Sequence, residues 1–212
     1  MKIYKKKIFK NTGELETVLS KSSYKISYAN LYSIGVNKNY VIKDYVLIDG
    51  WPIVPLLKHL HGIEVQLMSF YNMKSFWINF LKKNTIVIAG YSADDHKCIK
   101  KYFAKAGFDI PLMIDGYLSD ADLQFEIEAN ADKIIFLGIG QPRQEMLLEK
   151  LDDNCRVICC GAFFKQIAGI ESEYSGISRY LGLTSVMRWW KDPIMLLKRT
   201  LIPLSRIRGS FL

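Results

Sequence analysis

Six short apolar runs, rich in β-branched residues, alternate with longer segments of helical pattern along this 212-residue chain. Runs of this kind are typical of strands that are buried on both faces of a parallel sheet. The predicted strands cover residues 25–29, 45–49, 85–90, 112–114, 133–139 and 156–160. Between them, residues 93–106 and 120–129 repeat apolar side chains at helical spacing. This order predicts an α/β fold, a Rossmann-like and largely parallel sheet flanked by helices.

The composition and the cysteines narrow the class of protein further. Half of the residues are hydrophobic and 24% are charged, which excludes a disordered or collagen-like chain. No apolar stretch approaches the roughly 18 residues of a spanning helix, and the lysine-rich N-terminus lacks a signal-peptide core. Cys98, Cys155, Cys159 and Cys160 form no CxxC pair, which favours reduced thiols in a cytoplasmic protein.

The formal net charge of +8 is concentrated at the C-terminus. Residues 179–212 contain seven basic residues and one acidic residue, and the segment after Asp192 follows an amphipathic helical pattern. We therefore predict two parts, an α/β core over residues 1–173 and a helical, amphipathic, basic appendage over residues 174–212. The tryptophans and basic residues of this appendage favour a membrane surface over nucleic acid as its partner.

Ligands of parallel sheets bind beyond the carboxyl ends of the strands, so the residues after each predicted strand are the first candidates. In chain order these are Asn30, Asp49-Gly50, Gly90-Tyr91-Ser92, Asp115-Gly116, Gly138-Ile139-Gly140 and Gly161-Ala162. Asp49 ends a hydrophobic strand, and the sequence leaves open whether it is a general base or the cap of a helix starting near Pro52. Asp115 has the same local form, for which a simple turn is the stronger interpretation.

Residues 136–145 form the most unusual run in the chain. Gly138 and Gly140 precede a predicted helix, whose free N–H groups and dipole favour a phosphate or diphosphate. A tight strand-to-helix turn is the more common explanation of such spacing. The run is not a GxGxxG fingerprint, because Arg143 stands at the third glycine position, and it is not a P-loop.

Two pairs of residues invite comparison with metal sites. Asp120 and Asp122 spell the Asp-x-Asp of metal-dependent sugar transferases, but they follow Ser119 at the start of a helix, where capping is favoured. His59 and His61 have no Cys or carboxylate at ligand spacing, which favours surface histidines. We therefore expect no metal ion and no other cofactor.

Taken in order, the motifs between about residues 24 and 199 resemble those of the WecG/TagA/CpsF family of bacterial glycosyltransferases. The matching pieces are Ser27-Tyr-Ala-Asn30, Ile48-Asp-Gly-Trp-Pro-Ile-Val54, Gly62-Ile-Glu-Val, Asp115-Gly-Tyr117, Leu137-Gly-Ile-Gly-Gln-Pro-Arg-Gln-Glu145, Gly161-Ala-Phe-Phe164 with Ala168-Gly169, and Arg179, Gly182-Leu183, Arg188 and Asp192-Pro193. The element ending at Glu145, followed by Gly-Ala-Phe, is the specific part of this resemblance.

The resemblance implies an inverting transfer of a sugar from a UDP-sugar to a lipid-linked acceptor, usually an undecaprenyl-diphosphate saccharide, at the cytoplasmic membrane face. Family members serve teichoic acid, common antigen, O-antigen or exopolysaccharide assembly, so we expect a hexosyltransferase or an N-acetylhexosaminyltransferase. The family's proposed base aligns with Asp49, its sugar-contacting Asn with Asn30, and its Gln-Glu pair with Gln144 and Glu145. Its appendage binds the membrane and supplies active-site arginines, for which the candidates here are Arg188, Arg199, Arg206 and Arg208.

Reasoning from the residues agrees with this implication. Inversion requires one displacement, so one carboxylate, Asp49, suffices to take the proton of the acceptor hydroxyl. The backbone of residues 138–143 and an appendage arginine would stabilise the leaving diphosphate without a metal ion. The candidate substrate-binding residues are Asn30, Gly50, Gly138, Gly140, Arg143, Gln144, Glu145 and Gly161.

The chain departs from the family pattern at three places. His59 stands where an Arg is usual, Tyr180 follows Arg179 in place of Ala-Pro, and Thr184-Ser185 replace a Glu-Trp pair. Two other functions stay open, a non-catalytic nucleotide-sugar or membrane-binding subunit of the same fold and, less favoured, a nucleic-acid-binding protein. The sequence does not determine the donor sugar, the acceptor, the linkage, the pathway or whether the chain forms a homo-oligomer.

Overall fold

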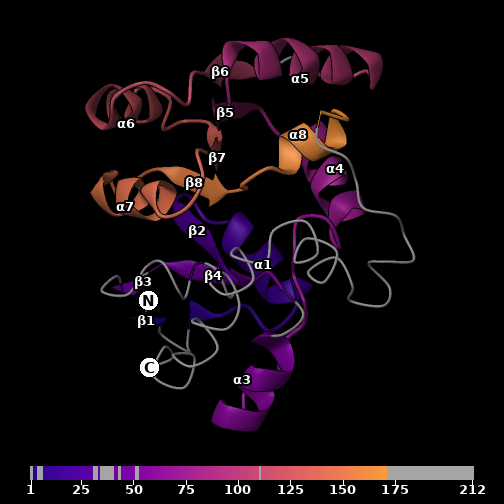
Figure 1. The fold of residues 1–212 in the computed structure, drawn as a ribbon, viewed down its shortest axis with the longest axis vertical. Coiled ribbons are helices and arrows are strands. Elements are labelled where there is room, and N and C mark those ends of the chain that lie inside the picture. The colour runs from indigo at the N-terminus through magenta and orange to yellow at the C-terminus, as the bar shows by residue number, and fades with distance from the viewer. Residues whose placement is uncertain are drawn as a thin grey trace, which may run out of the picture.

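The computed structural model of the chain describes residues 2–3, 7–30, 33, 41–42, 44–50, 53–109 and 111–170. The predicted appendage, its boundary after residue 173 and its candidate arginines Arg188, Arg199, Arg206 and Arg208 lie outside these residues. Within them, helices surround a central sheet (Figure 1).

The central sheet has six strands, each parallel to its neighbours, in the order β4-β2-β8-β7-β5-β6. The strands are β2 (Tyr24–Ala29), β4 (Tyr45–Ile48), β5 (Ile86–Gly90), β6 (Leu112–Ile114), β7 (Ile134–Gly138) and β8 (Arg156–Cys159). Each lies within one residue of a predicted strand at both ends, so the parallel α/β prediction is confirmed. β1 (Lys2–Ile3) and β3 (Val41–Ile42) form a separate parallel pair.

Helices cover both faces of this sheet. They are α1 (Thr12–Leu19), α3 (Ile53–His61), α4 (Lys74–Lys83), α5 (Ala93–Lys105), α6 (Asp120–Glu128), α7 (Arg143–Lys150) and α8 (Phe163–Ile167). One hydrophobic core joins the strands to α1, α4, α5 and α8, while α6 and α7 pack on the other face and α3 packs beside β4. Figure 1 shows α6 and α7 on one side of the strands and α4 and α8 on the opposite side.

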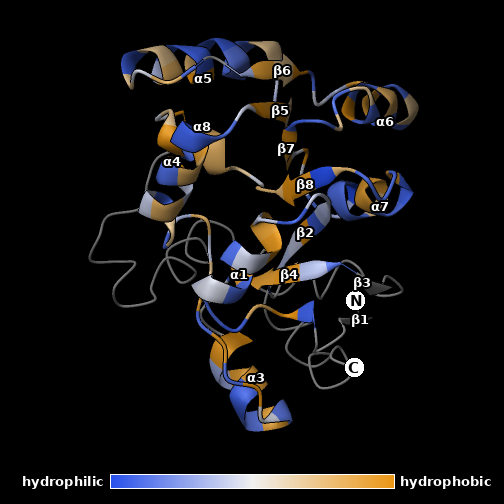
Figure 2. Cartoon of the chain, turned by 180° about the vertical axis from the view of Figure 1, so that it is seen from behind, coloured by the Kyte–Doolittle hydropathy of each residue, from blue (hydrophilic) through white to orange (hydrophobic). Residues whose placement is uncertain are grey.

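The strands are apolar along their whole length because both of their faces are covered. In β5, Ile86 and Ile88 belong to the core that includes α4 and α5, whereas Val87 and Ala89 belong to the core that includes α6 and α7. Every residue of β5 is buried. Figure 2 shows the hydrophobic colour on β5, β7 and β8, as a sheet with two covered faces requires.

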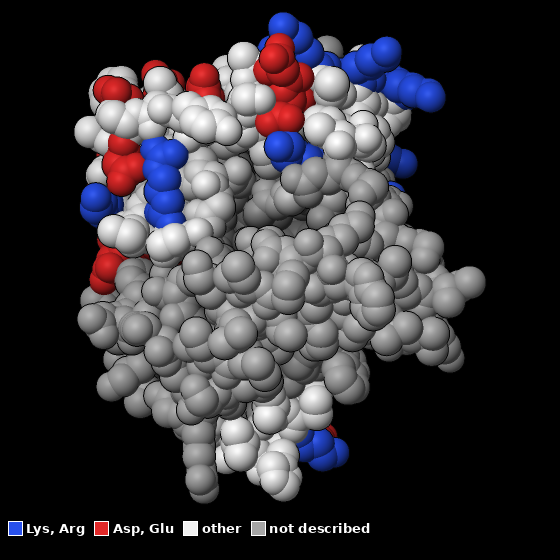
Figure 3. Space-filling model, in the orientation of Figure 1, with Lys and Arg blue, Asp and Glu red and all other residues white. Residues whose placement is uncertain are grey.

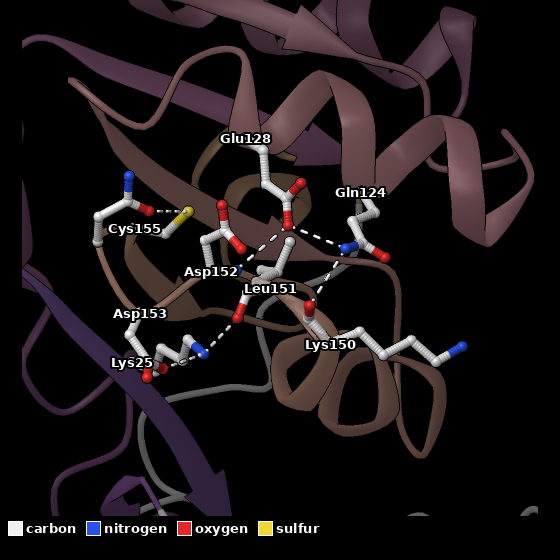
Figure 4. Close-up of polar contacts among 9 residues, drawn as sticks. Lys25, Gln124, Glu128, Lys150, Leu151, Asp152, Asp153 and Cys155 are labelled. Carbon is white, nitrogen blue, oxygen red and sulfur yellow. Dashed lines mark hydrogen bonds and ion pairs between the residues drawn. The ribbon is translucent and has the colours of Figure 1, made fainter.

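At the amino end of β2, a lysine joins elements that are distant in sequence (Figure 4). The Nζ of Lys25 donates to the Leu151 carbonyl at 2.6 Å and to the Asp153 carboxylate at 3.0 Å, and the Lys25 side chain is 9% exposed. Nearby, Gln124 of α6 donates to the carbonyl of Lys150 at the end of α7 (3.1 Å). These structural contacts lie at the sheet edge opposite the one where ligands of parallel sheets bind.

Charged side chains of both signs are interspersed on the described surface around α5 and α6 in Figure 3. Proteins that bind nucleic acid instead gather Lys and Arg on one face or along one helix. The described residues in this view form no such face, and most of the net positive charge belongs to residues 179–212.

Candidate functional site

The carboxyl ends of β4, β2, β8 and β7 are neighbours, so the residues that follow these strands meet at one edge of the sheet. Asp49 follows β4 and Asn30 follows β2. The N–H of Asp49 donates to the carbonyl of Ala29 at 2.9 Å, and a Cβ atom at Gly50 would lie 3.7 Å from the Cβ of Asn30. Asp49 and Asn30 therefore lie side by side, because β4 and β2 are neighbours in the sheet.

Asp49 directly follows β4 and precedes Ile53, the first residue of α3, by four positions. Burial, followed by the negative charge of Asp49, raises the pKa of Tyr28 well above its usual value. Asp49 is half-buried at the carboxyl edge, and its charge acts on the Tyr28 hydroxyl.

A short turn fixes the side chain of Asn30. Its Oδ1 accepts a hydrogen bond from the N–H of Ser33 (2.9 Å). The Ser33 hydroxyl accepts from the N–H of Asn30 (2.9 Å) and donates to its carbonyl (2.8 Å). Because Oδ1 is engaged in this turn, the NH₂ of Asn30 is the group suited to donate to a ligand.

The glycines at this edge are of two kinds. A Cβ atom at Gly138 would lie 2.5 Å from the hydroxyl of Tyr91, and one at Gly161 would lie 2.7 Å from the hydroxyl of Tyr28. Gly140 has a φ of +83°, and no atom of the described residues lies within 4 Å of its Cβ position. Packing inside the protein therefore requires Gly138 and Gly161, whereas Gly140 borders open space.

Two tyrosines lie at this edge: Tyr91, which is among the residues expected after a strand, and Tyr28, which the sequence reasoning did not single out. The Tyr91 hydroxyl donates to the carbonyl of Gly161 at 2.6 Å and lies 3.5 Å from Cys160 Sγ. Tyr91 has a φ of 65°, in the left-handed region, and burial raises its pKa well above the usual value, so the hydroxyl keeps its proton. Their positions at or just beyond strand ends are the sequence signal that points to both tyrosines.

A buried acid organises the start of α7. The Oε1 of Glu145 accepts hydrogen bonds from Gln141 Nε2 (2.8 Å), Gln144 Nε2 (3.0 Å) and the Ser27 hydroxyl (3.4 Å). Glu145 and Gln144 are both completely buried. Gln141 Nε2 also donates to the carbonyl of Tyr28 at 3.2 Å, so the network joins α7 to β2.

A buried acid, Glu145, lies at the N-terminus of α7. The glycine run predicts a phosphate at the free N–H groups, but Glu145 lies in the first turn of α7 and its carboxyl group accepts a backbone hydrogen bond there. Burial raises the pKa of Glu145. The segment between β7 and α7 is a tight strand-to-helix turn, in which Gly140 has a positive φ.

Arg143, an expected substrate-binding residue, makes contacts inside the protein. Its Nε donates to the carboxylate of Asp120 (2.7 Å), and its terminal nitrogens donate to the carbonyls of Gly116 and Leu118 (2.6 Å each). These three bonds hold the loop between β6 and α6. Sequence spacing did not reveal this role, because the reach of Arg143 depends on how α6 packs beside α7.

The pairs considered for metal binding have other roles or no ligand set. Ser119 is the N-cap of α6 and its hydroxyl accepts from the N–H of Asp122 (3.2 Å), which agrees with the capping interpretation. Asp115 accepts the N–H of Tyr117 (2.9 Å) in a turn, also as predicted. Among the described residues, which include His59, no three His, Cys, Asp or Glu side chains are grouped so that they could hold a metal ion.

Two further observations concern the thiols and the helices. Cys155, Cys159 and Cys160 are buried free thiols, as predicted, and Cys98 is an exposed free thiol. None of the helices within the described residues is both long enough and apolar enough to cross a bilayer.

Comparison with known proteins supplies the class of reaction. No curated protein matches the chain. The glycosyl transferase WecG/TagA/CpsF family matches residues 32–211, which is most of the chain and includes Asp49, the element of residues 137–145 and the appendage. The chain therefore belongs to the WecG/TagA/CpsF family of glycosyltransferases.

Proposed function

We propose that this glycosyltransferase moves a sugar from a UDP-sugar, with inversion, to an undecaprenyl-diphosphate-linked saccharide in bacterial surface polysaccharide synthesis. The observation that carries the proposal is the place of Asp49, at the carboxyl edge of the parallel sheet, beside Asn30 and near Tyr28. Ligands of such sheets bind at this edge, so a carboxylate here is in position to act on a bound substrate.

In the proposed reaction, Asp49 is the general base. Its carboxylate takes the proton of the acceptor hydroxyl while the hydroxyl oxygen forms a bond to the anomeric carbon of the donor. The bond from that carbon to the diphosphate breaks, and its electron pair leaves with UDP. A single displacement inverts the anomeric centre and needs one carboxylate, whose base catalysis typically contributes roughly 10²- to 10⁴-fold in rate.

The site geometry and the family support the remaining contacts of the proposal. The NH₂ of Asn30 donates to the transferred sugar, and Gly50 allows its close approach beside Asn30. The diphosphate lies along the open backbone at Gly140, and arginines of the appendage complete its binding from outside the described residues. The proposed reaction includes no metal ion, and the basic appendage holds the enzyme at the inner face of the cell membrane.

The test is release of UDP by the purified full-length chain from UDP-glucose, UDP-galactose and UDP-N-acetylglucosamine, with an undecaprenyl-diphosphate-linked sugar as acceptor. We expect Asp49→Asn to lower acceptor-dependent release by about 10²-fold or more with UDP affinity retained, because the isosteric amide cannot take the proton. Asp115→Asn is the matched control, since Asp115 also precedes a glycine after a strand but serves a turn. Its activity should stay at the wild-type level.

Three outcomes distinguish the readings of this site. Loss in Asp49→Asn alone supports the base assignment, and the donor that releases UDP identifies the sugar. Unchanged release in Asp49→Asn would overturn the base assignment while leaving the transfer reaction in place. Tight UDP binding without release from any donor would favour a non-catalytic binding subunit of the same fold.

A further inference from the structure

Two lysines meet at one aromatic ring at the amino end of β4. Lys7 Nζ lies 4.5 Å from the centre of the Tyr45 ring, and Lys21 Nζ lies 5.0 Å from it. Lys21 Nζ also donates a hydrogen bond to the Tyr45 hydroxyl at 2.8 Å. The ring of Phe9 stacks on the same ring with the two centres 5.4 Å apart, which holds Tyr45 in place. Segments before and after α1 thus bring two ammonium groups to a single side chain.

A cavity of about 410 Å³ lies beside this ring. It borders α1 and β4, which Figure 1 shows side by side. The cavity is lined by Lys7, Lys10, Glu14, Thr17 and Tyr45, together with the buried apolar residues Ile8, Phe9 and Val18. Its volume is in the range of sites that take small organic ligands. The lining therefore combines hydrogen-bond donors with apolar surface.

Among the described residues, lysines outnumber acids at this cavity. The ion pairs within the described part of the chain include none of Lys7, Lys10 and Lys21. Glu14, an acid of the lining, accepts the backbone N–H of Lys10 at 2.8 Å. Asp44 directly precedes β4, and burial raises its pKa, so its charged form is disfavoured. Like charges repel more strongly where water is partly excluded, and a bound anion would relieve this repulsion.

The Tyr45 hydroxyl is a further donor. An ammonium group has no acceptor, so the phenol oxygen accepts the hydrogen bond from Lys21, and its own proton stays available. No acceptor for that proton is found among the described residues. The hydrogen bond from Lys21, together with the charges of both lysines, lowers the pKa of Tyr45, and a phenol polarised in this way is a stronger donor. The site therefore suits a ligand whose oxygens accept hydrogen bonds.

We propose that Lys7, Lys21 and Tyr45 form a binding site for a terminal phosphate group. Such a phosphate has three acceptor oxygens, one for each of these three donors, whereas a carboxylate has two oxygens. The site is distinct from the candidate active site, because Tyr45 begins β4 and Asp49 follows its other end, about 13 Å away along an extended chain. The inference goes beyond the proposed function and does not rest on it.

Two sources can supply such a group. A small phosphorylated compound would place its organic part against the apolar lining of the cavity, and phosphatidic acid would present the same terminal phosphate at a membrane surface. Both share the chemistry that the three donors recognise, so the experiment has one arm for each source.

The first arm follows the tyrosine rings of the full-length chain by NMR after isotopic labelling of tyrosine. The signal that is missing from Tyr45→Phe belongs to Tyr45, and inorganic phosphate, added at constant ionic strength, should shift this signal in a saturable way. Lys7→Met and Lys21→Met should each weaken the affinity by about 10-fold or more, as expected for a hydrogen bond between charged groups. Lys82→Met is the matched control and should not change the affinity, because Lys82 lies over the ring of Phe108, which has no hydroxyl.

The second arm measures sedimentation of the full-length chain with lipid vesicles in phosphate-free buffer. For a lipid source, Lys21→Met should lower binding to vesicles of phosphatidylcholine and phosphatidic acid by about 5-fold, the contribution of one lysine at an anionic surface, and Lys82→Met should not. Vesicles in which phosphatidylglycerol replaces phosphatidic acid lack the terminal phosphate and should bind both variants alike. For a soluble source, both variants should bind all vesicles like the wild type, while phosphate still shifts the Tyr45 signal.

Three results would overturn the proposal. They are the absence of a Tyr45 shift with phosphate, the same shift with chloride alone, and an affinity for phosphate that falls no more in Lys7→Met and Lys21→Met than in Lys82→Met. Circular dichroism establishes that each variant is folded. A chain that binds phosphate at Tyr45 but releases no UDP from any donor would support this site while contradicting the proposed transfer reaction, so the two proposals fail separately.

Discussion

Replacing Gly161 by alanine tests whether this glycine is required by the packing of Tyr28. The new Cβ would lie 2.7 Å from the Tyr28 hydroxyl oxygen and 3.3 Å from its Cζ atom. Gly161 also has a φ of +53°, which alanine adopts at a cost of about 1–2 kcal/mol. The close contact is an overpacking defect, which typically costs about 1–3 kcal/mol.

Together these effects predict that Gly161→Ala lowers the free energy of unfolding by about 3 kcal/mol. For a chain of this length, that loss corresponds to a fall in Tm of about 6–12 °C. Tyr28→Phe removes the hydroxyl, after which the nearest ring atom is 3.3 Å from the new Cβ. The double variant should therefore recover the overpacking part of the loss, leaving the backbone strain of about 1–2 kcal/mol.

The assay is urea-induced unfolding of the four members of this double-mutant cycle, followed by circular dichroism. Gly107→Ala is the control, because Gly107 has a similar φ of +70° with no described atom within 4 Å of its Cβ position. It should lose only about 1 kcal/mol, since alanine also lowers the entropy of the unfolded chain. A loss in Gly161→Ala no larger than in Gly107→Ala, or no recovery with Tyr28→Phe, would refute the packing argument.

Two further predictions concern stability. Lys25→Met should lower the free energy of unfolding in guanidinium by about 1–3 kcal/mol, because the Leu151 carbonyl loses its hydrogen-bond donor. The control Lys97→Met, which removes an exposed ion pair with Asp94, should cause no measurable change. Equal effects of the two substitutions would contradict this prediction. Because burial raises the pKa of Glu145, the stability that its protonated form provides is full below the unfolded pKa and is lost as pH rises through the folded pKa. Glu145→Gln should therefore gain stability relative to the wild type as pH rises above the ordinary carboxyl pKa of 4.5, and a difference that does not change with pH would contradict this.

The strands were predictable because of how they are covered. A strand between two helical layers buries both of its faces, so the run of residues 134–138 is apolar without interruption and its ends are visible in the sequence. The starts of α5 and α6 were predictable because the side chains of Ser92 and Ser119 cap them. α4 begins at Lys74 without a side-chain cap, so its start leaves no such signal, and it was not predicted.

That Asp49 and Asn30 lie at the same edge of the sheet was also predictable, whereas the structure shows that their strands are neighbours. Parallel strands bring their carboxyl ends to one edge, so two residues that follow neighbouring strands lie together whatever the details of side-chain packing. The glycines of residues 138–140 were visible for a related reason, since a chain that leaves a strand and enters a helix needs a tight turn.

The hydrogen-bond partners of the long polar side chains were decided by the tertiary structure alone. Arg143 reaches the loop before α6, and Glu145 turns inward to collect Gln141, Gln144 and Ser27. Neither result follows from spacing along the chain, because it depends on the few ångströms that separate α7 from α6 and from β2. Periodicity determines which face of an element is buried, whereas packing determines which polar groups meet there. This is why the sheet and its carboxyl edge were predictable and the network behind that edge was not.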